Sequence, residues 1–416
     1  MRIRKITQRE LFEIILLLVL FYSQGANVLN IGNTVVSALI SVIVLLFLYR
    51  QYHVGIPKYA VIVFSILLLN HLITGFVGGA GLLEGFNFST WLEMVFFYLG
   101  VFFVYQIDPR NAMTKFIKIV VFFAAISLVC YVIILNGHGS LLSKVFPSRW
   151  GTGSRQYCGS IFYAYCSRFD RNNGVFYEPG VYQISLVMCI YSMLYMTEKI
   201  NINQKTRNVF LIILVLSLIT TKSTTGYLGL AVIFAGFLIK KKERSTATVG
   251  IIIIMFAGYL VYDYYSNGAQ SLVQIYLIDK LSETTTRDIT LSSGGARIVA
   301  MKLGIQAALN HPFGIGYLNW DRQLQNIYGV KFGTGNALFS LLGIRGFCAF
   351  FCALYLAIIP SIKTMKSISA IIVYIFLFIN ITSAQGKIFY PAILMAAFLL
   401  YDELDETERF GLYYIE

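Results

Sequence analysis

The feature that most constrains this chain is a succession of apolar runs, each close to the length of a membrane-spanning helix. A bilayer core of about 30 Å needs roughly 20 apolar helical residues to cross it. Twelve runs meet this description, near residues 11–29, 31–49, 58–77, 91–106, 114–135, 174–197, 207–221, 224–240, 247–265, 336–360, 367–383 and 387–401. They predict an all-α polytopic membrane protein with about 12 transmembrane helices.

The composition supports this prediction. Hydrophobic residues make up 57% of the 416 residues and charged residues 13%, whereas a soluble chain usually carries about 25% charged residues. The chain therefore cannot cover a water-facing surface. This excludes a soluble enzyme, a secreted disulfide scaffold and a disordered protein.

Basic residues predict the orientation, because they concentrate in short cytoplasmic loops. With the N-terminus inside, the cytoplasmic segments contain most of the short-loop cations: Arg2, Arg4, Lys5, Arg9, Arg50, Lys58, Arg110, Lys115, Lys118, Lys199, Lys205, Arg207, Lys240, Lys241, Lys242, Arg244, Lys363 and Lys366. Only Lys222 and Lys387 lie in short connections on the other side. We expect both termini to be cytoplasmic, and the net charge of +13 to reflect topology and not a nucleic-acid partner.

Two long outer loops interrupt the single membrane domain 1–416, at residues 136–173 and 266–335. Loops of this length are usually functional or disordered, and their aromatic residues argue for order. In the second loop, apolar residues recur at helical spacing beside Lys302. This pattern predicts an amphipathic helix near 297–310, lying at the membrane interface.

The segment from Arg168 to Gly180 carries an arginine pair and a carboxylate just before an apolar run. Pro179 suits the first turn of a helix, so Glu178 falls at its N-cap, where a carboxylate is stabilised by exposed amides. Glu178 is therefore either a capping acid or a proton acceptor at the membrane boundary. Arg168 and Arg171 either contact lipid headgroups or hold an anion beside it.

In the second loop, Arg297 follows a Ser-Ser-Gly-Gly stretch that indicates a helix start. An approachable helix N-terminus with an arginine in its first turn can bind phosphate. His311 precedes Pro312 and a Gly-x-Gly turn. It is therefore either a helix C-terminal cap or a functional residue.

Two further cations are candidates for substrate binding. Lys222 lies in a hydroxyl-rich hairpin, residues 220–226. Arg345 falls within a predicted span, where an arginine either has a function or snorkels to the headgroups. No His, Cys or carboxylate cluster has metal-ligand spacing, so we expect no metal and no cofactor.

These motifs resemble those of the Wzy-type bacterial polysaccharide polymerases and the related O-antigen ligases. Arg297 followed by His311-Pro-Phe-Gly-Ile-Gly316 is similar to the late-loop pattern of that superfamily. The Arg-x-x-Gly-x-x-x-Glu-Pro-Gly stretch at 171–180 is similar to a motif of polymerases from capsule and exopolysaccharide clusters. Ligases typically carry His-Asn before the span that follows the large loop. Here the position is Gly335-Asn336, which favours a polymerase.

The resemblance implies a GT-C-like membrane glycosyltransferase in the bacterial cytoplasmic (inner) membrane. It would join undecaprenyl-pyrophosphate-linked oligosaccharides, with the lipid pyrophosphate as leaving group and without a metal. Glu178, Arg171 and Arg297 are then the catalytic candidates. The substrate-binding candidates are Arg168, Lys222, Lys302, His311, Asn336 and Arg345. Membrane lipids, a flippase and a chain-length regulator are the implied partners.

Three other functions are open at this stage. The first is a ligase of the same superfamily. The second is a lipid-linked oligosaccharide flippase or transporter, which would place ionisable groups near the bilayer midplane. The third is a non-enzymatic assembly partner, which would not bring Arg171, Glu178 and Arg297 together.

Overall fold

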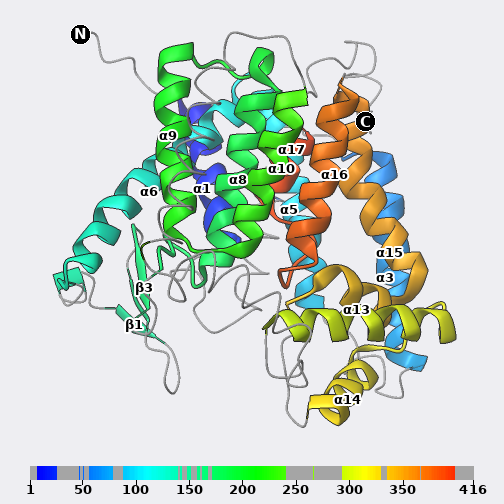
Figure 1. Ribbon diagram of the computed structural model, residues 1–416. Coiled ribbons are helices and arrows are strands. Elements are labelled where there is room, and N and C mark those ends of the chain that lie inside the picture. Colours follow the sequence, from blue (N-terminus) through cyan, green and yellow to red (C-terminus); the bar gives the residue numbers. More distant parts are fainter. Residues whose placement is uncertain are drawn as a thin grey trace.

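The apolar runs fold into a helix bundle with one helix lying across its end (Figure 1). The computed structural model describes residues 7–25, 46, 50, 56–77, 88–138, 141–142, 148–150, 157–159, 162–166, 171–239, 266, 293–328, 335–365 and 367–398. The first half of the bundle consists of α1 (Gln8–Ser23), α3 (Lys58–Val77), α5 (Phe88–Ile107), α6 (Ala112–Leu135), α8 (Pro179–Tyr195), η1 (Thr197–Lys199) and α9 (Gln204–Thr220). The remaining helices are α10 (Thr224–Ile239), α13 (Ser293–Asn310), α14 (Tyr317–Tyr328), α15 (Ala337–Thr364), α16 (Ile368–Thr382) and α17 (Pro391–Ala397).

The predicted spans agree with these helices wherever the structure describes them. The run at 58–77 coincides with α3, and most of the others are shifted by only a few residues at either end. The predicted spans 31–49 (apart from Leu46) and 247–265 lie outside the described residues. Twelve spans therefore remain a prediction.

Three described helices are long and apolar enough to cross a membrane: Lys58–Phe76, Ala112–Leu135 and Ala337–Ile362. Shorter apolar helices occupy Trp91–Ile107, Thr224–Phe237 and Ile368–Thr382. By length and composition, the described chain is a helical membrane protein.

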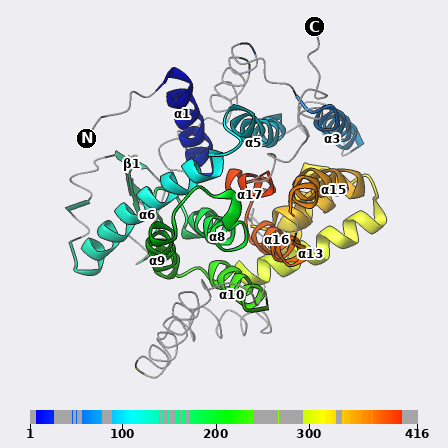
Figure 2. The ribbon, with the colours of Figure 1, turned by 90° about the horizontal axis from the view of Figure 1, so that it is seen from above.

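Helix α8 occupies the centre of the bundle (Figure 2). It packs against α6, α9, α10 and α17, and every residue from Val181 to Tyr195 is buried. A helix that is apolar on all sides must be enclosed by others. The start of α8, where Glu178 lies, is thus held by several surrounding helices.

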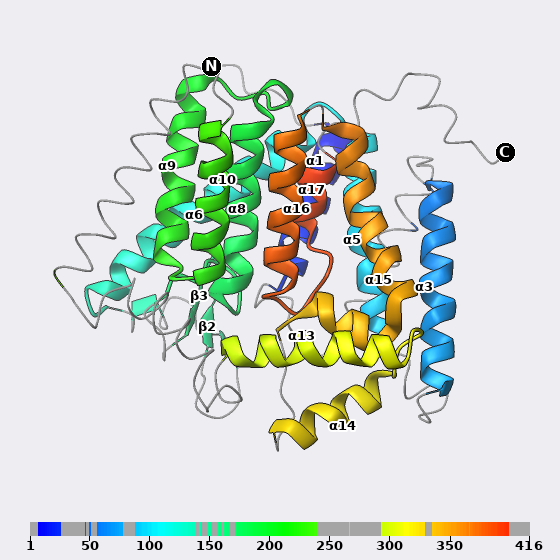
Figure 3. The ribbon, with the colours of Figure 1, turned by 45° about the vertical axis from the view of Figure 1, so that its right-hand side comes forward.

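Helix α13 lies across the bundle end at which α8 begins, with α14 on its outer side (Figures 1 and 3). A helix thus covers the residues of the amphipathic helix predicted near 297–310, and its position at the membrane interface stays a prediction. Its buried residues are small, including Ala300, Gly304 and Ala307, whereas Ile305 and Leu309 are exposed. A Cβ on Gly304 would lie 2.3 Å from the Phe339 carbonyl oxygen. Small residues thus allow the backbones of α13 and α15 to approach closely.

The first outer loop contains strands, which corrects the expectation of a purely helical protein. Strands β1 (Ser148–Trp150), β2 (Tyr157–Gly159) and β3 (Ala164–Cys166) form an antiparallel sheet in the order β1-β2-β3. Each strand has only three residues, too few for the alternation that indicates a strand in a sequence.

Contacts at the two ends of the bundle join segments that are distant in the sequence. Lys115 binds Glu13 and Asp108 at the end opposite to α13. The backbone N–H of Tyr177 donates to the Gly25 carbonyl at the α13 end. The orientation of these two ends relative to the cytoplasm remains a prediction.

Candidate active site

The segment that leads to Glu178 is held by a buried polar network. The Asn172 side chain donates to the hydroxyls of Ser127 (3.1 Å) and Thr220 (2.9 Å) and accepts from the Gly174 N–H (3.0 Å). The Tyr182 hydroxyl lies 2.9 Å from the Ser127 hydroxyl. A buried network in which several partners are satisfied makes a segment rigid. Residues 172–178 are thereby attached to α6, α8 and α9.

Glu178 occupies the N-cap of α8, as predicted, but its side chain does not act as a cap. Among the described residues it makes no capping hydrogen bond to α8, and it is exposed. Pro179 takes the first helical position. The purely capping interpretation of Glu178 is therefore wrong. The carboxylate is directed to the surface at the α13 end.

Arg297 is the charged partner that the structure places near Glu178. It lies in the first part of α13 and is partly buried. Burial lowers the pKa of its guanidinium, whereas the charge of Glu178 raises it. Two residues from separate motifs therefore interact. A partly desolvated guanidinium also attracts anions more strongly than one in bulk water.

Asn336 fixes the position of Arg297 and is not oriented as a ligand-binding group. Its side-chain amide donates to the Arg297 carbonyl (3.1 Å) and accepts from the Phe339 N–H (3.2 Å). The residue is 3% exposed. It therefore caps α15 and ties that helix to α13.

Arg171 lies next to the turn between α9 and α10. The N–H of its neighbour Asn172 donates to the Thr220 carbonyl at 3.0 Å. Lys222 occupies the same turn with a φ of +49°, and both cations are partly exposed. Arg171 and Lys222, two of the predicted cations, thus lie at or beside the same turn. Arg168 lies outside the described residues, and Lys302 is exposed on α13.

The turn that contains His311 has an architectural role. The N–H groups of Ile315 and Gly316 donate to the carbonyls of Gly343 (3.1 Å) and Ile344 (3.0 Å). In return, the Phe347 N–H donates to the Pro312 carbonyl at 2.9 Å. The turn therefore holds α15 at residues 343–347.

At this place α15 is broken. Gly346 has a φ of +75° and a ψ of −171°, which are not helical. Residues 337–345 lie beside α13, and residues 347–364 run along the bundle (Figure 3). A Cβ on Gly346 would lie 2.1 Å from the Pro312 carbonyl oxygen, so the break requires glycine. The predicted span 336–360 has the length and composition of a membrane-crossing helix, but it is broken at Gly346, and its first part lies beside α13 (Figure 3).

The length of α13 separates His311 from Arg297. The two residues are 14 positions apart along one helix, or roughly 20 Å at 1.5 Å per residue. The His311 backbone N–H donates to the Ala307 carbonyl, which continues the last turn of α13. Its side chain is exposed. The helix-end interpretation of His311 is thus the one that fits.

Arg345 points into the protein, which excludes snorkelling. It is 3% exposed, and its guanidinium donates to the His71 carbonyl (3.3 Å) and to the Thr74 hydroxyl on α3. The Asn70 side chain donates to the Arg345 carbonyl at 3.0 Å. Arg345 therefore joins the broken α15 to α3.

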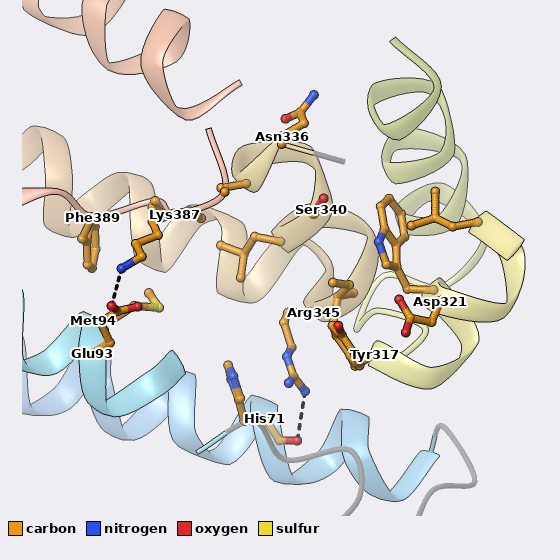
Figure 4. A pocket seen from close by; sticks show the side chains of 18 of the residues that line it. His71, Glu93, Met94, Tyr317, Asp321, Asn336, Ser340, Arg345, Lys387 and Phe389 are labelled. Atoms are coloured by element: carbon orange, nitrogen blue, oxygen red, sulfur yellow. Dashed lines mark hydrogen bonds and ion pairs between the residues drawn. The ribbon is translucent and has the colours of Figure 1, made fainter. Parts of the chain in front are cut away.

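A cavity of about 430 Å³ opens between these elements (Figure 4). Its walls come from α3, α5, α14, the first part of α15 and residues 386–389. Glu93 and Lys387 form an ion pair on one wall. Asn336 borders the cavity, and its side chain points away from Lys387 and Arg345. The cavity is therefore next to the backbone that holds Arg297.

Sequence reasoning missed the cavity, because its polar residues come from five separate segments. Glu93 and Asp321 belong to none of the sequence motifs described above. Among the described residues, no group of three or more His, Cys, Asp or Glu side chains could hold a metal ion.

Residues 209–354, roughly a third of the chain, match the family model described as O-antigen ligase. The matched region runs from α9 through most of α15 and includes Lys222, Arg297, His311 and Arg345. Glu178 and Arg171 lie before it. The match supports the O-antigen polymerase and ligase superfamily, and with the apolar helices it supports an integral membrane protein. It does not distinguish polymerases from ligases. No curated protein matches this chain.

Proposed function

We propose that this protein polymerises undecaprenyl-pyrophosphate-linked oligosaccharide repeat units at the outer face of the bacterial cytoplasmic membrane. The observation that carries the proposal is that Glu178 and Arg297, from separate motifs, lie close enough for the charge of Glu178 to raise the pKa of the Arg297 guanidinium. This pair combines an exposed carboxylate with a partly desolvated cation at one end of the bundle. That end is the outer one in the topology predicted from the basic residues.

The proposed reaction forms one glycosidic bond and breaks another bond to the same carbon. A hydroxyl at the non-reducing end of one unit attacks the anomeric carbon of the growing chain. The bond from that carbon to the lipid pyrophosphate breaks, and the pyrophosphate leaves with the electron pair. Glu178 accepts the proton of the attacking hydroxyl.

Cations supply the other half of this mechanism. Negative charge develops on the pyrophosphate as it leaves, and fixed donors stabilise such charge in the transition state. Arg297 is the first candidate, because the charge of Glu178 raises the pKa of its guanidinium. Arg171 and Lys222, at the α9–α10 turn, are candidates for the remaining phosphate oxygens. A planar guanidinium can grip two of these oxygens at once.

Polymerase is favoured over ligase by two observations. Gly335 stands where ligases typically have a histidine, and Asn336 is occupied in holding Arg297 and Phe339. The acidic residue at the site, Glu178, comes from the motif that resembles polymerases. The transporter alternative is less well supported, because Arg345 serves a structural contact between α15 and α3.

Deleting the gene and sizing the lipid-linked and surface glycans tests the proposal. Loss of a polymerase leaves single repeat units. Loss of a ligase leaves polymer that stays on its lipid carrier, and loss of a flippase leaves no units at the outer face. Only the first outcome supports the proposal, and either of the other two would overturn it.

A further inference from the structure

The 430 Å³ cavity has no part in the proton transfer and charge stabilisation described above. Its volume falls within the roughly 300–1,000 Å³ of small-ligand sites. It lies between the bundle and α14, at the end of the bundle that α13 crosses (Figures 3 and 4). The structure therefore contains a second place where part of a substrate can bind.

The charges on the cavity wall balance. Lys387 is paired with Glu93, and the Arg345 guanidinium donates to His71 and Thr74. Asp321 adds a further carboxylate. The two carboxylates, Glu93 and Asp321, offset the two cations, so the wall offers a pyrophosphate no net positive charge. The wall thus favours an uncharged ligand.

The remaining lining groups suit a sugar ring. Tyr317 is 42% exposed, so part of its ring can lie against the C–H face of a sugar. Asp321, one helical turn further along α14, can accept hydrogen bonds from hydroxyls, and Ser340 can donate or accept. Together these groups offer the mixture of aromatic and polar contacts that binds an uncharged polyhydroxyl ligand.

We infer that this cavity binds uncharged sugar rings of the lipid-linked oligosaccharide, with Tyr317 and Asp321 as its specificity-determining residues. The inference rests on the proposed function and deepens it, because it separates recognition of the saccharide from recognition of the pyrophosphate. Asn336 connects the two sites, since it borders the cavity and donates to the Arg297 carbonyl.

Binding to the purified full-length protein tests this separation with two probes. The first is the free oligosaccharide, released by mild acid from lipid-linked units of cells that lack the gene. The second is undecaprenyl pyrophosphate without sugar. A double variant, Tyr317→Ala with Asp321→Ala, tests the cavity. A single variant, Arg297→Lys, tests the pyrophosphate site. Arg322→Ala on the same helix is the matched control, because Arg322 is exposed and does not line the cavity.

We expect the double variant to bind the free oligosaccharide at least tenfold more weakly and undecaprenyl pyrophosphate normally. Arg297→Lys should show the reverse pattern. Trp320 and Leu324 form the buried side of α14 and are unchanged, so α14 should still dock. Normal oligosaccharide binding by the double variant would overturn the inference. Loss of undecaprenyl pyrophosphate binding by the double variant, with oligosaccharide binding retained, would also overturn it.

A transfer assay separates the two sources of the sugar. A raised KM for the single repeat unit would identify the acceptor, and a raised KM for the chain-bearing donor would identify the growing chain. Both results support a saccharide site, and an unchanged KM for both substrates contradicts it. Failure of the proposed function would appear differently, as normal polymer length after deletion of the gene.

Discussion

Two short segments at the α13 end of the bundle, 171–180 and 311–316, look alike in sequence but differ in what they do. Each combines glycine and proline with a titratable residue next to a helix, Glu178 in the first and His311 in the second. In 171–180 the backbone is held by the Asn172 network, and Glu178 is presented near Arg297. In 311–316 the backbone forms hydrogen bonds that hold the break in α15, and the His311 side chain is exposed. A motif of this kind can therefore serve side-chain chemistry or backbone architecture, and the contacts in the folded chain show which role it has.

The largest effect should come from the backbone of the second segment. Gly346→Ala places a Cβ 2.1 Å from the Pro312 carbonyl oxygen at a φ that side chains rarely adopt. We expect most of the folded protein to be lost, as measured by detergent-solubilised yield and melting temperature. Gly386→Ala is the matched control, because a Cβ there meets nothing within 4 Å. Equal yields from the two variants would contradict the proposed break in α15.

The next effect should be on activity and not on folding. Arg297→Lys keeps the charge but loses the planar fork that grips two oxygens. Loss of one fixed donor to a developing anion typically lowers kcat by 10²–10³-fold, and we expect a decrease at the lower end of this range. Arg322→Lys, at an exposed position of α14, should leave the rate almost unchanged. The rate of polymer formation by purified protein of equal melting temperature measures the difference.

A smaller effect should follow from loosening the first segment. Asn172→Ala leaves the buried hydroxyls of Ser127 and Thr220 without this donor, at a cost of about 1–3 kcal/mol. We expect a lower melting temperature and a decrease in activity of about tenfold, since Glu178 would be held less firmly. Asn201→Ala, at an exposed position at the opposite end of the bundle, is the control. An unchanged rate would show that the Asn172 network does not position Glu178 for the reaction.

The smallest effect should come from the side chain of the second segment. His311→Ala removes an exposed imidazole and leaves the three backbone hydrogen bonds of the turn intact. Activity and melting temperature should remain within about twofold and a few degrees of the wild type, in line with most surface substitutions. A loss of activity of a hundredfold would instead assign chemistry to His311.

The sequence predicted the helices well because hydrophobic length is a local property. The run at 58–77 has the bounds of α3, and the helix near 297–310 was found as α13. The break in α15 could not be predicted in this way. Residues 336–360 are apolar throughout, and the non-helical Gly346 is held by hydrogen bonds from residues more than 30 positions earlier. The glycines at 314, 343 and 346 were the available signal.

The candidate site could be predicted only in part. Glu178 and Arg297 stood out because a carboxylate and an arginine next to apolar runs are unusual, and in the folded chain the charge of Glu178 raises the pKa of Arg297. Arg345 stood out for the same reason, yet its contacts are to α3. Charge at a membrane boundary thus identifies important residues without separating catalytic from structural ones. The cavity escaped prediction because Glu93, Asp321 and Lys387 come together only in the folded chain.

The most direct test of the account compares Glu178→Gln with Glu198→Gln in a polymer-forming assay of purified protein. The two carboxylates lie at opposite ends of α8, and both are exposed. If Glu178 accepts the proton of the attacking hydroxyl, its replacement should lower the rate by 10²–10⁴-fold at an unchanged melting temperature, whereas Glu198→Gln should retain the wild-type rate. Wild-type polymer formation by well-folded Glu178→Gln would contradict the central claim that this segment carries the chemistry.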